Sequence, residues 1–576
     1  MTTIGAGRFD VEVVYDELKT RAGEAPVRDL SEDSIRRRLR LCGFGLAAAF
    51  AALGIKTVDL ALNTPAPTYA GRSVAGADAP PRLEDSQGRS LAVSIAGFGL
   101  AIDGRDVWDT EEAAEGLATI FPKLDPGKLR VKLDAQQRVI VDHVISEDQR
   151  RAAIALGLPG LSFPPTEVRR YPQGRLFSHV VGYQIPGRGG VTGLEAAATA
   201  RELSGPQRTT LNVTAQTILL SELSLAMETF SAKAAWGMLM HVHDGSVAAM
   251  VSLPDFDPNV PGQSPANARR NRLASDTYEL GSAFKALTVA AALEHNIAQL
   301  ETPVNVTSPL QVGDWAIEDY SIKGPVLSVE EILAVSSNIG TGQLALVLGA
   351  EKFVATMAAL GLTERLETAL PESRAPLLPQ QWGEAELVTS SYGHGIAVSP
   401  IHLTAAFAAT VNGGVYVTPR FFADDPVEGR QVLSPETSAE MRRGLRAVIT
   451  KGTGGNAEAE GFYVIGKTAT ADKPVAGGYR DDGPLLSSFI GAFPGYNPEY
   501  VLLISLDEPQ GTAETYGYAT AGWTAAPVFR RSVERLAPAL GIMPAREDMA
   551  ADGFLEVMRR RTPVPQLAHG RGEGAL

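Results

Sequence analysis

The stretch that decides the fold is Tyr278-Glu-Leu-Gly-Ser-Ala-Phe-Lys285, which leads into an apolar helical pattern. A spacing of three residues places Ser282 and Lys285 one helical turn apart on the same face. A serine hydroxyl needs a base, and a lysine becomes one when burial or a nearby cation lowers its pKa. Ser282 would begin a predicted helix Ser282–Glu294, where the helix dipole favours developing negative charge. The stretch therefore predicts a nucleophile with its base, although an N-cap serine followed by a surface lysine has the same spacing.

Two more strings follow in order, Ser336-Ser-Asn338 and Lys467-Thr-Ala469. Ser336 is suited to relay a proton, and Asn338 is suited to bind a substrate amide and to hold Lys285. The third string follows an apolar, strand-like run, Phe462-Tyr-Val-Ile465, so we expect Lys467 beside a strand next to the nucleophile. Each string alone has a simpler interpretation: a helix cap for the second and a solvated edge-strand lysine for the third.

Taken together and in this order, the three strings resemble the active site of the penicillin-interacting serine transpeptidases. The lead-in Tyr278 to Gly281 is similar to that of class B penicillin-binding proteins, and Asn338 is typical of their division branch. Tyr392-Gly-His-Gly395 and Arg170-Tyr-Pro-Gln-Gly174 extend the resemblance in both directions. The resemblance implies an α+β penicillin-binding transpeptidase fold, an antiparallel sheet covered by helices. It also implies an elongated N-terminal pedestal domain and one transmembrane helix.

The resemblance also implies the roles of the site residues. The implied catalytic residues are Ser282, Lys285, Ser336, Asn338 and Lys467. The implied substrate-binding residues are Thr468, Ala469 and Thr470. In this family Lys467 and the Thr468 hydroxyl would bind a substrate carboxylate, and the backbone N–H groups of Thr470 and Ser282 would form an oxyanion hole. No cofactor and no metal is implied.

One position departs from the family pattern, because the third string ends in Ala469 where the family has glycine. If the added methyl faces the bound acyl group, a displacement of about 1 Å costs on the order of a hundredfold in rate. If the methyl points away, little changes, since alanine tolerates the extended backbone. The alternative to an active enzyme is therefore a catalytically impaired scaffold of a division complex.

The implied function is septal peptidoglycan cross-linking by serine acyl transfer in bacterial cell division. Ser282 would attack the penultimate D-alanine carbonyl of a stem peptide, and β-lactams would acylate the same serine. The implied partners are peptidoglycan stem peptides, a membrane glycosyltransferase and other division-complex proteins. A β-lactamase or β-lactam sensor shares the fold, but no carboxylate in the sequence can be assigned to deacylation.

Length, charge and cysteine content narrow the possible classes of protein further. The chain has 576 residues, which suggests two or three domains. A net charge of −14 argues against a nucleic-acid partner. The single cysteine, Cys42, allows no intrachain disulfide and no cysteine cluster for zinc.

A membrane anchor is expected near the N-terminus. The uncharged run Leu41–Ile55 is shorter than the roughly 20 residues that span a bilayer, but Lys56 can snorkel and an apolar segment follows it. Four arginines precede the run: Arg36, Arg37, Arg38 and Arg40. This asymmetry predicts an inner-membrane protein with its N-terminus in the cytoplasm and its bulk outside. A cleaved signal peptide and a buried soluble helix are the competing interpretations.

The predicted organisation has five parts: a cytoplasmic tail 1–40, a transmembrane helix 41–60, a linker and pedestal domain 61–225, a transpeptidase domain 226–545 and a C-terminal tail 546–576. Within the transpeptidase part, two strand pairs are expected, each joined by turn residues. They are Trp236–His241 with Val247–Ser252, and Phe489–Phe493 with Tyr500–Leu506. A helix is expected over Ile401–Val411.

Overall fold

The structure is a computed structural model that describes residues 80–320, 324–474, 478–480 and 483–545, together with four helical positions between 43 and 51. The predicted cytoplasmic tail and C-terminal tail lie outside these residues. The same is true of most of the predicted membrane span and linker, so these remain predictions. Among the described residues, no helix combines the length and apolar character that a membrane crossing needs.

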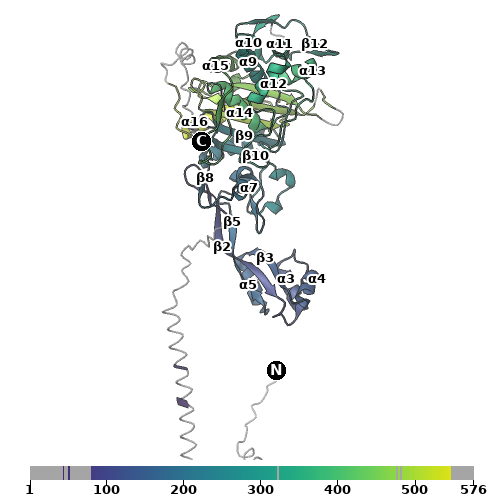
Figure 1. The fold of residues 1–576 in the computed structure, drawn as a ribbon, viewed down its shortest axis with the longest axis vertical. Coiled ribbons are helices and arrows are strands. Elements are labelled where there is room, and N and C mark those ends of the chain that lie inside the picture. Colours follow the sequence, from purple (N-terminus) through teal and green to yellow (C-terminus); the bar gives the residue numbers. More distant parts are fainter. Residues whose placement is uncertain are drawn as a thin grey trace, which may run out of the picture. The chain divides into compact units, whose positions relative to one another are not determined.

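A five-stranded antiparallel sheet organises the second half of the chain (Figure 1). Its strands, in spatial order, are β10 (Val247–Leu253), β9 (Ala234–His241), β19 (Tyr500–Asp507), β18 (Leu485–Phe493) and β17 (Ile465–Asp472). Both predicted strand pairs are confirmed as antiparallel neighbours, with somewhat longer strands than expected. The first strand, β9, pairs with the last, β19, so the centre of the sheet joins the two ends of this part of the chain.

The strand next to the nucleophile begins later than the sequence suggests. The run Phe462 to Val464 is not a strand, and β17 begins at Ile465 and carries the third string itself. Tyr463 has a left-handed backbone with φ of 48°, which an extended strand does not allow. The apolar side chains of Phe462 and Val464 are nevertheless buried in the core. β17 is an edge strand, but Lys467 is buried on it, so the simpler interpretation of a solvated edge-strand lysine is wrong.

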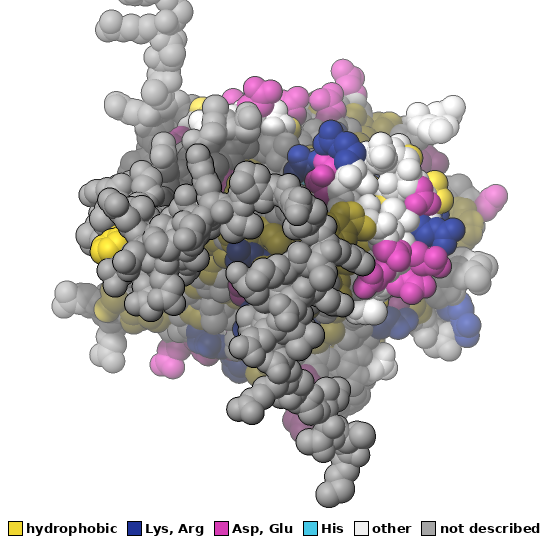
Figure 2. Space-filling model, turned by 90° about the horizontal axis from the view of Figure 1, so that it is seen from below, with side chains coloured by type: hydrophobic (Ala, Val, Ile, Leu, Met, Phe, Trp, Pro, Cys, Tyr) yellow, Lys and Arg dark blue, Asp and Glu magenta, His cyan; other side chains and the backbone are white. Residues whose placement is uncertain are grey.

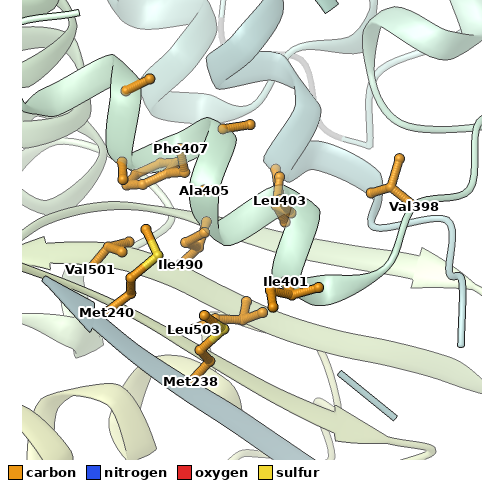
Figure 3. Close-up of a cluster of buried hydrophobic side chains, with 14 of the residues drawn as sticks. Met238, Met240, Val398, Ile401, Leu403, Ala405, Phe407, Ile490, Val501 and Leu503 are labelled. Carbon is orange, nitrogen blue, oxygen red and sulfur yellow. The ribbon is translucent and has the colours of Figure 1, made fainter. Parts of the chain in front are cut away.

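Helices cover the sheet, as predicted, and they lie on both of its faces. On one face pack α14 (Pro400–Val411) and α15 (Pro435–Thr450), and α9 (Phe284–Glu294) packs against these two helices. On the other face pack α8 (Val213–Thr229) and α16 (Ala525–Ala539). Alternate residues of a strand point to opposite faces of the sheet. Met238 and Met240 of β9 therefore face α14, and Leu239 belongs to the buried cluster on the opposite face. Figure 3 shows Ile401, Leu403 and Phe407 of α14 above these methionines.

A mostly helical region is inserted between α9 and α14 and carries the second string. Its helices are α10 (Val329–Val335), α11 (Asn338–Leu348), α12 (Ala350–Ala359) and α13 (Glu384–Ser391). Its strands form two small pairs, β11 (Pro303–Asn305) with β14 (Val326–Ser328), and β12 (Leu310–Val312) with β13 (Trp315–Ile317). A third small pair, β15 (Val415–Val417) with β16 (Gly429–Gln431), follows α14.

Residues 80–208 form the part that precedes the central sheet. Its strands are β1 (Leu83–Glu84), β2 (Ser90–Asp103), β3 (Arg138–Ile145), β4 (Leu161–Ser162), β5 (Pro165–Arg170), β6 (Gln184–Ile185), β7 (Gly189–Gly190) and β8 (Gln207–Arg208). Its helices are α3 (Thr110–Ile120), α4 (Pro126–Asp134), α5 (Glu147–Ala155), α6 (Ser178–Val181) and α7 (Gly193–Ala200). The long strand β2 pairs with β5 in its first half and with β3 in its second half. A separate core, with Leu100, Ile102 and Leu117, lies between the second half and the helices α3, α4 and α5.

Specific contacts join this part to the sheet-bearing part. Arg201 forms an ion pair with Asp425 at 2.8 Å. Thr209, the residue directly after this part, forms a β-bridge with Phe422. The surface carries acidic and basic side chains beside one another, as Figure 2 shows for one face. The ion pair between Arg130 and Glu111, at 3.4 Å, is one example.

Candidate active site

The nucleophile candidate lies on a tight turn that touches β17. Ser282 lies in the 3-10 turn η4 (Gly281–Ala283), so the predicted helix from Ser282 begins as a tighter turn and becomes α-helical at Phe284. Gly281 has φ of +51°, and a Cβ added there would lie 2.9 Å from the Thr470 carbonyl oxygen. Glycine thus allows the turn to press against the strand. The structure brings Ser282 and Thr470, the two expected oxyanion donors, to adjoining segments.

Lys285 lies in the first turn of α9 with 1% of its surface exposed. Its Nζ donates to the Ser336 carbonyl oxygen at 2.5 Å and to the Ser336 hydroxyl at 3.1 Å. Burial lowers the pKa of Lys285 to about 7, and the Asp319 carboxylate acts in the opposite direction. A lysine with such a pKa is partly neutral near neutral pH, so it can accept a proton.

Ser336 has an unusual backbone that directs two of its oxygen atoms at Lys285. It ends α10 in the left-handed region, with φ of 65° and ψ of 46°. This conformation costs a non-glycine residue about 1–2 kcal/mol. The next residue, Ser337, caps α11, because its hydroxyl accepts from the Gly340 N–H at 2.9 Å. The helix-cap interpretation is therefore correct for Ser337, and Ser336 remains available to the lysine.

Asn338 is held by the loop that follows β13. Its side-chain nitrogen donates to the Glu318 carbonyl oxygen at 3.0 Å, and its backbone N–H donates to Asp319 at 2.5 Å. The sequence suggested that Asn338 would hold Lys285. The hydrogen bonds of the lysine ammonium instead go to Ser336.

Lys467 is completely buried on β17. Its Nζ donates to the Thr468 carbonyl oxygen at 3.0 Å and lies 3.4 Å from the Thr468 hydroxyl. Burial holds the pKa of Lys467 well below its usual range, and repulsion from the Lys285 ammonium lowers it further. The two buried lysines therefore do not readily hold two positive charges at once. The Thr468 hydroxyl also contacts the Thr453 hydroxyl at 2.6 Å.

The methyl of Ala469 lies in the protein interior. Its exposure is 2%, and it belongs to the same buried cluster as Ala283 and Phe284 of the nucleophile segment. Strand alternation puts Ala469 on the same face as Lys467 and opposite to Gly466, where an added Cβ would lie 2.7 Å from the Phe489 ring. Thr470 is anchored by the Ala521 N–H, which donates to its hydroxyl at 3.0 Å.

Two features of the site were missed by sequence reasoning. The first is Asp319, which contacts the second string, and the chain before it shows no pattern that marks it. The second is Glu279, whose carboxylate accepts from the Gly395 N–H at 3.0 Å and from the Tyr479 hydroxyl at 2.8 Å. Glu279 also forms an ion pair with His394 at 3.1 Å. Glu279 and His394 both lie in stretches that the sequence singled out, but nothing in the sequence connects them.

Contacts among Glu279, His394 and Tyr479 shift the pKa values of Glu279 and His394. The bond from Glu279 raises the pKa of His394 against the effect of burial. Burial acts to raise the pKa of Glu279, but the bonds from His394 and Tyr479 lower it overall. The carboxylate therefore joins three segments: the turn before Ser282, the loop after α13 and the connection between β17 and β18.

Two family models match the chain. Residues 236–534 match the penicillin binding protein transpeptidase domain. Residues 81–199 match the penicillin-binding protein dimerisation domain.

Named relatives match over most of their length. A protein of Caulobacter vibrioides named "Probable peptidoglycan D,D-transpeptidase FtsI" is 37% identical over 477 residues, covering 80% of this chain and 81% of that protein. The "Peptidoglycan D,D-transpeptidase FtsI" of Escherichia coli K12 is 26% identical over 492 residues, covering 78% and 81%. Among solved structures, the transpeptidase domain of Burkholderia pseudomallei penicillin-binding protein 3 is 31% identical with a TM-score of 0.53. It covers 59% of this chain and 98% of that chain.

Proposed function

Since the chain belongs to the penicillin-binding protein transpeptidase family, as a class B member of the division type, we propose that it cross-links septal peptidoglycan by serine acyl transfer. The observation that carries the proposal is the junction of the three strings: the Ser282 turn touches β17 at Thr470, and Lys285 on the same helix bonds to Ser336. Lys467 lies on β17 together with Thr470, so the third string is part of this junction.

In the first step, Ser282 is the nucleophile and Lys285 the base. The Ser282 oxygen attacks the carbonyl carbon between the two terminal D-alanines of a stem peptide, and its proton passes to the neutral Lys285 amine. The backbone N–H groups of Ser282 and Thr470 stabilise the negative charge on the carbonyl oxygen. Burial supports the role of Lys285, because it lowers the lysine pKa to about 7.

The tetrahedral intermediate then collapses as its C–N bond breaks. The leaving D-alanine nitrogen takes the proton that Lys285 holds, by way of the Ser336 hydroxyl 3.1 Å away. Lys467 assists this proton return. The product is an ester between Ser282 and the donor stem. An amine from a neighbouring stem attacks that ester, forms the cross-link and returns the proton to the Ser282 oxygen.

Substrate binding falls to the third string and to Asn338. Lys467 and the Thr468 hydroxyl bind the substrate carboxylate, and Asn338 binds a stem amide. The methyl of Ala469 is buried among side chains of the nucleophile segment and does not project into open space, which supports an active enzyme. Nothing among the described residues favours the alternative of a catalytically impaired scaffold.

The proposal also assigns a role to each region of the chain. Residues 61–225 form the linker and pedestal, residues 226–545 the transpeptidase domain, and residues 41–60 a membrane anchor with the catalytic domain outside. The pedestal and anchor contact a membrane glycosyltransferase and other division proteins. The name of the Escherichia coli relative, a peptidoglycan D,D-transpeptidase, supports the cross-linking activity. β-Lactams, as mimics of the donor, acylate Ser282.

Labelling with a fluorescent penicillin tests the proposal. Purified chain is incubated with the probe, and the adduct is located by peptide mapping. The expected adduct lies on Ser282, and Ser282→Ala abolishes labelling. Ser224→Ala, an exposed serine on α8, is the matched control and labels like the natural chain. A folded natural chain that takes no label would move the assignment to the scaffold.

A further inference from the structure

Asp319 is not part of the second string, but its carboxylate accepts hydrogen bonds from two residues of that string. Its Oδ2 accepts from the Ser337 hydroxyl at 2.6 Å. Its Oδ1 accepts from the backbone N–H groups of Asn338, at 2.5 Å, and Ile339, at 3.1 Å. Both carboxylate oxygens are therefore committed to the first residues of α11, and they fix the side chain and backbone between the two candidate catalytic residues.

These bonds explain how Ser336 keeps its left-handed backbone. A strained conformation persists only where the surroundings over-determine it. Ser336 is preceded by the last turn of α10 and followed by Ser337, whose hydroxyl is held by Asp319 and by the Gly340 N–H. With both sides fixed, the carbonyl oxygen and the hydroxyl of Ser336 stay on the Lys285 ammonium.

Asp319 also brings a negative charge to the lysines. Its field acts on Lys285 against the effect of burial, and Lys285 in turn acts on Lys467. The Asp319 carboxylate and the Lys285 ammonium also bond to neighbouring residues of one turn, Ser337 and Ser336. Without the carboxylate, Lys285 would hold its proton less tightly.

We propose that Asp319 is a positioning residue for acyl transfer, which fixes the Ser336–Asn338 turn around the Lys285 ammonium and faces the lysine pair with a negative charge. The inference rests on the proposed transpeptidase function and adds to it a residue outside the three strings. Asp319 acts through Ser337 and Lys285 and does not itself contact the reacting atoms.

A simple helix cap is the competing explanation, and pH separates the two. A residue that only caps α11 affects the acylation rate by the same factor at every pH. A residue that also supplies charge to Lys285 changes the pH at which the base becomes available. The neutral lysine is the base, so the rate rises as the pH passes the lysine pKa. Removing the Asp319 charge lowers that pKa, and the rise must move to lower pH.

The experiment measures the acylation rate of full-length chain by a fluorescent penicillin between about pH 5.5 and 9.5. For Asp319→Asn we expect a plateau reduced about tenfold to a hundredfold by the misplaced turn and a midpoint at lower pH than the natural chain. For Ser337→Ala, which keeps the carboxylate, we expect a reduced plateau with an unchanged midpoint. Asp314→Asn, an equal charge change on the exposed β12–β13 turn, should behave like the natural chain.

The outcomes divide clearly. Asp319→Asn with the natural midpoint overturns the inference, whatever its plateau, because the residue is then at most a cap. If Asp319→Asn does not fold, Asp319→Glu replaces it. This variant should keep the pH midpoint of the natural chain and reach a lower plateau rate. If both Asp319→Glu and Ser337→Ala reach the plateau rate of the natural chain, the inference is overturned. A natural chain that takes no label overturns the proposed function and this inference together, whereas a labelled natural chain with an unaltered Asp319→Asn profile overturns the inference alone.

Discussion

At the scale of single residues, two buried lysines set the chemistry of the site. Lys285 and Lys467 are both almost fully buried, and burial lowers the pKa of each. In water both ammonium groups would stay charged. Because burial excludes water, one of the lysines can lose its proton and act as a base. The Ser336 oxygens give the Lys285 proton two acceptors, which keeps the amine in place.

A pH profile follows from the Lys285 pKa of about 7. Because the base must be neutral, the acylation rate of the natural chain should increase about tenfold per pH unit below pH 7 and level off above it. The measurement is stopped-flow or quenched labelling over that range. A rate that is independent of pH from 5.5 to 8 would contradict the role of Lys285 as base.

Lys285→Arg provides the complementary test. Arginine keeps the positive charge at every accessible pH, so it cannot accept the serine proton. We expect labelling to be lost across the whole pH range, with a fall of at least about a thousandfold at the plateau. Lys352→Arg, the same change on the exposed surface of α12, is the control and should leave the rate unchanged.

Ala469→Gly tests where the added methyl acts. The side chain is 2% exposed, so its removal takes away one buried methyl and adds backbone freedom on a strand. We expect the free energy of unfolding to fall by about 1–2 kcal/mol and the acylation rate to stay within about threefold. Thermal unfolding and labelling measure the two effects. Ala471→Gly on the same strand controls for backbone freedom, and a large gain in rate for Ala469→Gly alone would show that the methyl crowds the acyl group.

Residue types and spacing predicted which segments meet, but not which side chains bond to one another. Serine and lysine three residues apart, followed by the two later strings, sufficed to place Ser282, Lys285 and Lys467 near one another. The left-handed backbone of Ser336 had no signal, because serine is not a residue that favours it. Asp319 had none either, because it binds mostly backbone N–H groups and so leaves no paired pattern in the sequence.

At the scale of elements, the Glu279 carboxylate joins three segments around the nucleophile turn. It bonds to Gly395 and Tyr479 and pairs with His394. Behind it the glycine loop lies directly on the turn, since a Cβ on Gly393 would be 2.2 Å from the Gly281 carbonyl oxygen. The turn that carries Ser282 is therefore held from the side of α13 as well as from β17.

Glu279→Gln should loosen this junction. The amide keeps some hydrogen bonds but loses the ion pair, so the raised pKa of His394 should fall toward its ordinary value. Because the pair is partly exposed, we expect only about a threefold loss in acylation rate, corresponding to roughly 0.6 kcal/mol. An NMR titration of the histidine ring protons measures the pKa. Glu384→Gln, an exposed carboxylate on α13, is the control, and an unchanged His394 titration in Glu279→Gln would contradict the ion pair.

Elements were predictable where the pattern was regular. Apolar runs joined by turn residues marked β9 with β10 and β18 with β19, and an apolar helix marked α14. The start of β17 was not predictable, because Phe462 and Val464 are apolar residues that pack in the core without forming a strand. A buried irregular segment and a buried strand have the same composition when both faces are covered.

At the scale of the whole molecule, a buried ion pair fixes the first described strands. Arg169 and Glu195 lie 2.7 Å apart with side chains 4% and 1% exposed, and Arg169 also donates to the Pro81 carbonyl oxygen. Burial raises the pKa of Glu195 in spite of the arginine. The pair therefore links β5, α7 and the chain that enters β1.

Arg169→Met should destabilise the protein, because it leaves Glu195 buried without its partner. The expected loss is about 3–5 kcal/mol in the free energy of unfolding, measured by denaturant titration. Since burial raises the pKa of Glu195, the uncompensated carboxyl takes up a proton as the pH falls, and the deficit should shrink toward acid pH. Arg105→Met at an exposed ion pair is the control and should change little. Equal effects of the two variants would contradict a structural role for the buried pair.

The pairing of β9 with β19 has a consequence for how the protein is made. The central pair of the sheet joins the first strand to one that the ribosome completes only near the end of the chain. Until residues 500–507 have been synthesised, β9 presents an unpaired apolar edge, which is a site for aggregation and for chaperones. A premature stop before Tyr500 would remove the middle of the sheet rather than its margin. The cell would then have no partially working product, only a chain for proteolysis.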